Sequence, residues 1–134
     1  MDMYRSMKAA SDGAPEVGES GRSLGVRVPQ DLPVDPAGWV FPGTGGMSVA
    51  MKDPRCLSRA RRPRALGGHS RDPLFVMAEE ALPEALTLRE DPPASGHGLV
   101  EPVGPVAVGA FQAALGDTRS DWVKVRHVGS ISLD

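Results

Sequence analysis

Alternation of apolar and polar residues predicts short strands along most of the chain. The first, at residues 3–7 (MYRSM), would place Tyr4 and Ser6 on one face and Met3, Arg5 and Met7 on the other. A cation among methionines indicates either a strand-end residue that reaches solvent or a residue of a site. Alternation or β-forming residues predict further strands at 24–28, 73–77, 86–89 and 98–101.

The segment 38–51 (GWVFPGTGGMSVAM) carries two apolar runs around a group of turn residues. We predict a strand, a glycine turn and a second strand, in which Met47, Val49 and Met51 face one way and Ser48 and Ala50 the other. Such a turn lets a ligand approach the backbone closely. An ordinary tight turn is the alternative.

Helical periodicity is clear only at 104–115 (GPVAVGAFQAAL). Pro105 suits the first turn of a helix, and Gly116 is a stop signal. The apolar residues that would share one face are Val108, Phe111, Ala114 and Leu115. Trp122 would dock the tail, whose last residues (127–134) we expect to fray.

These elements predict one α+β domain over residues 1–134, with six or seven short strands in a mainly antiparallel, split sheet and one helix. With 16 glycines and 13 prolines the chain should be rich in loops. The longest of these, 52–72, exceeds the usual length of a connection, which favours a functional or mobile segment.

The net charge of −2 gives no general attraction to nucleic acid or to membranes. The charge is nevertheless unevenly distributed. Six arginines lie in a stretch with no acidic residue: Arg55, Arg59, Arg61, Arg62, Arg64 and Arg71. The rest of the chain holds 9 basic against 17 acidic residues. This arginine-rich loop is interpreted as a solvated loop or as a contact for substrate or partner. A specific nucleic-acid site is disfavoured, because Phe75 is the one aromatic residue nearby.

The single cysteine, Cys56, excludes an internal disulfide and favours a reducing compartment. The N-terminal stretch has no apolar signal core, and the longest apolar run, 103–115, is too short for a membrane span. We therefore expect a cytoplasmic protein without a membrane segment, with any export into target cells using a route that needs no cleaved signal.

The glycine turn matches none of the common catalytic fingerprints. No lysine follows Gly46, as a phosphate loop requires, and Ser48 stands where the dinucleotide fingerprint has its third glycine. On the strand at 98–101, His97 and Glu101 would share a face, which suits a pocket with a proton carrier and a carboxylate. An exposed histidine and an unrelated glutamate are the alternative. A zinc site is not indicated, because Cys56, His69, His97 and His127 lack metal-binding spacing.

Several blocks follow one another in a distinctive order. Tyr4-Arg5 comes first, then LGVR, then a TGG-x-SV block (Thr44–Val49), then LPEALTLRED and GHGLVEP, and last a helix just after proline. Over residues 3–122 this order resembles the family of small NAD-dependent, ADP-ribosyltransferase-like toxins delivered by bacterial type VI secretion systems.

The resemblance implies an ADP-ribosyltransferase-like split antiparallel β-sandwich with few helices, and a toxin that uses NAD as substrate. Cleavage of the nicotinamide–ribose bond would then transfer ADP-ribose to an unknown acceptor or hydrolyse NAD, and a cognate immunity protein would be a partner. The residues implied to bind NAD are Arg5, Tyr4, Thr44, Gly45, Gly46 and Ser48. Those implied in catalysis are His97, Glu101 and Ser48.

Two alternatives remain open. Met47 stands where the family block commonly has threonine, which favours a non-catalytic interaction protein that keeps the fold. The arginine-rich loop would suit an RNA-directed enzyme of the same superfold.

Overall fold

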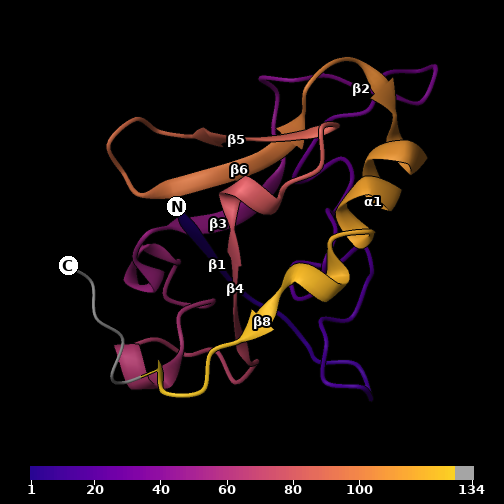
Figure 1. Cartoon of the computed structure of the whole chain (residues 1–134). Coiled ribbons are helices and arrows are strands. Elements are labelled where there is room, and N and C mark those ends of the chain that lie inside the picture. Colours follow the sequence, from indigo (N-terminus) through magenta and orange to yellow (C-terminus); the bar gives the residue numbers. More distant parts are fainter. Residues whose placement is uncertain (129–134) are drawn as a thin grey trace.

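The strands form a six-stranded antiparallel sheet and a separate two-stranded sheet (Figure 1). The computed structural model describes residues 1–128. The large sheet has the order β5-β6-β3-β1-β4-β8, and the small sheet pairs β2 with β7. The bounds are β1 Asp2–Ser6, β2 Trp39–Val40, β3 Met47–Met51, β4 Leu74–Ala78, β5 Leu86–Glu90, β6 His97–Pro102, β7 Val106–Ala107, α1 Val108–Gly116 and β8 Val123–Lys124. The predicted α+β class with a mainly antiparallel sheet is confirmed.

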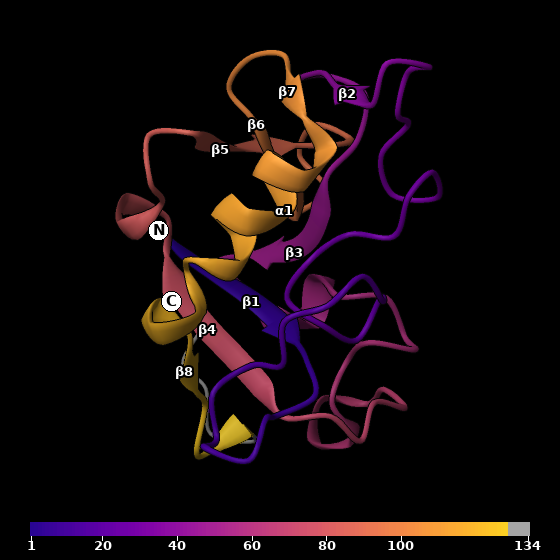
Figure 2. The ribbon, with the colours of Figure 1, turned by 90° about the vertical axis from the view of Figure 1, so that its right-hand side faces the viewer.

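The large sheet opens between β1 and β3. β1 pairs along its whole length with β4, from Asp2 opposite Ala78 to Ser6 opposite Leu74. Its pairing with β3 is limited to Met3 with Met51 and Tyr4 with Ala50. In Figure 1 β5 and β6 run across the picture whereas β4 runs down it, and Figure 2 also shows the two halves running in different directions. The sheet therefore divides into a β3-β6-β5 half and a β1-β4-β8 half beyond Tyr4.

One face of the sheet carries the main core. As alternation predicts, Met3 and Met7 are both fully buried there, together with Met47 and Val49 of β3. The opposite face has a smaller cluster of Tyr4, Ala50, Leu57 and Leu74. Val128, in the tail predicted to fray, packs against this second cluster, and residues 129–134 lie outside the described part.

Helix α1 covers the main core with Phe111 and Leu115, each about 1% exposed. It begins four residues later than predicted, because Val106 and Ala107 pair with β2 instead of starting the helix. Among residues 1–128, no helix has the length and apolarity that a bilayer crossing requires.

One of the predicted strands is wrong. Residues 24–28 form a loop, because the side-chain amide of Gln112 takes both the N–H and the carbonyl of Val26 (3.1 and 2.8 Å) that a neighbouring strand would use. The segment 38–51 does contain two strands, but they are not partners across the turn. β2 joins the small sheet and β3 the large one.

Candidate functional site

A cavity of about 210 Å³ lies where the two halves of the sheet separate. Three residues predicted for the site line it together: Arg5 of β1, Ser48 of β3 and His97 of β6. They come from three different strands and are far apart in sequence. The remaining lining residues, from β1 and from loops on either side, are Ser6, Gly21, Arg27, Asp31, Leu57, Ser58 and Arg61.

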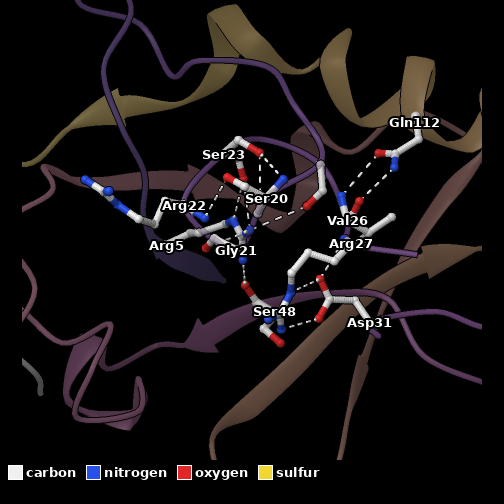
Figure 3. A network of polar contacts seen from close by, with 11 residues as sticks. Arg5, Ser20, Gly21, Arg22, Ser23, Val26, Arg27, Asp31, Ser48 and Gln112 are labelled. Carbon is white, nitrogen blue, oxygen red and sulfur yellow. Dashed lines mark hydrogen bonds and ion pairs between the residues drawn. The ribbon is translucent and has the colours of Figure 1, made fainter. Parts of the chain in front are cut away.

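The Arg5 guanidinium is held by backbone carbonyl groups on both sides of the opening (Figure 3). Its Nε and Nη2 atoms donate to Ser23 at 3.2 and 2.9 Å, and Nη1 donates to Ser48 at 2.7 Å. Longer contacts of 3.4 Å reach Gly21 and Gly25. Carbonyls alone accept from it among residues 1–128, so it is a buried cation without a carboxylate in direct contact.

The pKa of Arg5 is lowered to about 10, mainly by burial; the charge of Asp31 opposes this shift, and the nearby charges of Arg61 and Arg27 add to it. The side chain is 6% exposed. A guanidinium remains protonated at neutral pH even after such a shift. The cavity therefore contains a permanent positive charge in a poorly solvated position, where electrostatic interactions are stronger than in water.

Arg27 and Asp31 form an ion pair on the same wall (Figure 3). Asp31 accepts from Arg27 Nη2 at 2.7 Å, from its Nε at 3.2 Å and from its backbone N–H at 2.8 Å. Burial raises the pKa of Asp31, but the hydrogen bonds and charge of Arg27 and the charge of Arg5 outweigh it and hold the pKa below its usual range. Among residues 1–128, Asp31 is the one acidic residue that lines the cavity, and nothing in its sequence context marked it for the site.

His97 meets the cavity with a defined tautomer. Its Nδ1 lies 2.7 Å from the carbonyl oxygen of Asp91. Because a carbonyl can only accept, Nδ1 carries the proton, and Nε2 of the neutral ring is then a hydrogen-bond acceptor. Ser48 adds a hydroxyl that has no hydrogen-bond partner in residues 1–128, since its contact with Arg5 uses the carbonyl. Both residues line the same cavity.

Glu101 lies apart from this cavity, although it is on the same strand and face as His97. Glu101 lies four positions beyond His97, which is about 13 Å along a strand. The Glu101 carboxylate is 5% exposed, accepts from Gly43 N–H at 2.9 Å and pairs with Arg89 at 3.1 Å. Its contacts fix the glycine turn to β6.

The other residues implied to bind NAD also lie outside the cavity lining. Tyr4 packs in the second cluster, where burial raises its pKa, and Thr44 is exposed and donates to Phe41. Gly45 and Gly46 make room for the protein's own backbone, since added Cβ atoms there would collide with the carbonyl oxygens of Asp31 and Val100. Gly46 N–H donates to the Asp31 carbonyl at 3.0 Å, so the turn supports the cavity wall.

The arginine-rich loop reaches the cavity through Arg61. Ser6 Oγ donates to the Arg61 carbonyl at 2.6 Å, which anchors the loop on β1. The sequence marked the loop but did not single out Arg61, because six arginines in 17 residues give no periodic signal. In residues 1–128, no three His, Cys, Asp or Glu side chains gather as metal ligands.

Comparisons with models of protein families, with characterised proteins and with solved structures return no match for this chain.

Proposed function

We propose that the protein is a cytotoxic effector that binds NAD in this cavity and cleaves it, by ADP-ribosyl transfer or by hydrolysis. The observation that carries the proposal is the convergence of Arg5, Ser48 and His97 on one cavity at the division of the sheet. These residues stand in the three blocks on which the resemblance to NAD-using toxins depends. The cationic wall adds support, because NAD carries a negatively charged diphosphate.

The reaction breaks the bond between ribose C1′ and the nicotinamide nitrogen, and the bonding electrons leave with nicotinamide. The ribose passes through an oxocarbenium-like state, which an ionised carboxylate stabilises. Asp31 is the carboxylate in the cavity lining. A water or an acceptor hydroxyl then bonds to C1′ and loses its proton, for which His97 Nε2 is the available acceptor. The Ser48 hydroxyl is placed to hydrogen-bond a polar substrate group.

The test is nicotinamide release from NAD by the purified protein, measured by chromatography, together with growth on expression. We expect release and growth arrest with the wild type, and loss of both with His97→Ala or Ser48→Ala. His69→Ala is the matched control, because His69 is exposed in the arginine-rich loop and does not line the cavity. Absence of NAD binding by calorimetry together with normal growth would rule the proposal out.

A second candidate is a non-catalytic interaction protein with the same fold. The position of Glu101 favours it, because this carboxylate is engaged by Arg89 and Gly43 rather than exposed to the cavity. This candidate predicts NAD binding without nicotinamide release, or neither. Detectable turnover that depends on His97 would exclude it.

A further inference from the structure

Three guanidinium groups, those of Arg5, Arg27 and Arg61, lie around Gly21, and they differ in their hydrogen-bond partners. Arg5 donates to the Gly21 carbonyl, and Arg27 Nε lies 3.7 Å from the position that a Gly21 Cβ would occupy. Arg61 Nη2 lies only 2.3 Å from that position. Asp31 is the one carboxylate among the lining residues. An excess of positive charge therefore collects in a small volume, and a bound anion would relieve the repulsion.

The hydrogen bonds identify which arginine is available to such an anion. Arg5 donates to four backbone carbonyls, which leaves little more than the second hydrogen of Nη1. Arg27 is neutralised by two hydrogen bonds to Asp31. Arg61 makes no side-chain hydrogen bond or ion pair with any of residues 1–128. None of its five donors has a partner within this part of the chain.

The backbone around Arg61 holds this side chain at the cavity. Its N–H donates to the Ser58 carbonyl at 2.9 Å and its carbonyl accepts from Ser6 Oγ, so the turn is tied to β1. The lack of a side chain at Gly21 gives the guanidinium its place on the opposite wall. Arg61 is thus a partly buried, positioned cation rather than a solvated one.

We propose that the cavity is a diphosphate site in which Arg61 is the principal ligand, whereas Arg5 mainly holds the cavity together. A guanidinium presents paired N–H groups that match two phosphate oxygens, and the spare Nη1 hydrogen of Arg5 supplies a further contact. This inference rests on the proposed function only in taking the diphosphate to be part of NAD.

The experiment is calorimetric titration of the full chain with inorganic pyrophosphate at low ionic strength. We expect binding by the wild type and at least tenfold weaker binding by Arg61→Ala. A second variant, Gly21→Ala, keeps every charge but places a methyl group 2.3 Å from the present position of Arg61 Nη2, so it should displace the guanidinium and also weaken binding at least tenfold. Arg59→Ala is the matched control, because Arg59 is exposed in the same loop and does not line the cavity; it should stay within twofold.

Failure to bind pyrophosphate, or equal affinity in Arg61→Ala and Arg59→Ala, would overturn this inference. The outcome is separable from that of the proposed function. Arg61-dependent pyrophosphate binding without NAD cleavage would support the diphosphate site and remove the NAD-cleaving effector. NAD cleavage with an unchanged KM in Arg61→Ala would support the NAD-cleaving effector and remove Arg61 as the diphosphate ligand.

Discussion

Arg5 Nη1 donates a 2.7 Å hydrogen bond to the Ser48 carbonyl at the point where β1 and β3 separate. Backbone pairing of these strands ends at Tyr4 and Ala50, one residue before Arg5. Beyond this point the guanidinium, rather than a backbone N–H, connects β1 to β3. It also donates to the Ser23 carbonyl and so holds the loop at Ser23 against the two strands. An arginine that the sequence marks for ligand binding is therefore part of the structure that keeps the cavity open.

Replacement of Arg5 by alanine should destabilise the protein strongly. The Ser23 and Ser48 carbonyls would lose their donors in a buried place, and such losses together cost about 3 kcal/mol or more. Urea unfolding followed by circular dichroism measures the free energy of unfolding. Arg59→Ala, at an exposed position, should change it by less than about 0.5 kcal/mol. Equal stability of the two variants would show that the Arg5 contacts contribute nothing.

Asp31 should make the stability depend on pH at the acidic end. Its folded pKa lies below the usual range, so the native carboxyl holds a proton less tightly than the unfolded one. The resulting stabilisation is fully present above the unfolded value of about 3.9 and is lost as pH falls through the folded pKa. Urea midpoints of wild type and Asp31→Asn at several pH values measure the effect. We expect the difference between them to be largest at pH 7 and to shrink toward pH 3.

Glu19→Gln is the control for this pH series. Glu19 is exposed and makes no side-chain hydrogen bond within residues 1–128. Its variant should differ little from the wild type at every pH. A gap for Asp31→Asn that stays constant from pH 7 to pH 3 would contradict the assigned role of the carboxylate.

Much of the fold was accessible from local patterns. Alternation gave the strand containing Arg5 and its two faces, since Met3 and Met7 are fully buried. The prediction failed at 24–28, which alternates as a strand does but finds a Gln112 side chain as its partner. A long-range contact of this kind leaves no periodic mark. For the same reason, the sequence did not show that β2 and β3 belong to different sheets.

The site was predictable only where its residues stand in ordered blocks. Arg5, Ser48 and His97 were marked in this way and line one cavity. Asp31 and Arg61 were not singled out, because their role comes from folding two loops against β1. Glu101 was expected beside His97 from alternation alone, but the position of a side chain along a strand also depends on its own partners, here Arg89 and Gly43.

Gly46, in the glycine turn, should not tolerate even an alanine side chain. A Cβ at this position would lie 2.5 Å from the Val100 carbonyl oxygen, which is backbone and cannot move aside easily. We expect Gly46→Ala to lower the free energy of unfolding by about 2 kcal/mol. Gly109→Ala makes the same chemical change in α1, where nothing lies within 4 Å of the new methyl group, and should raise stability by about 0.5 kcal/mol. Thermal unfolding of both variants tests this, and equal losses would refute the backbone-contact explanation.

Substitutions of Glu101 and of His97 should affect different properties, the first the stability of the fold and the second the proposed reaction. Glu101→Gln weakens a buried ion pair and the hydrogen bond from Gly43, so the free energy of unfolding should fall by about 1–2 kcal/mol. Under the proposed cleavage of NAD, nicotinamide release by the variant below its unfolding temperature should stay within about threefold of wild type, because Glu101 does not line the cavity. Under the same proposal, His97→Gln should abolish release with little loss of stability, since its ring makes a single hydrogen bond within residues 1–128, to the Asp91 carbonyl. Loss of release in both variants with stability intact would instead make the Glu101 carboxylate part of the reaction, reached by a rearrangement of the β5–β6 hairpin.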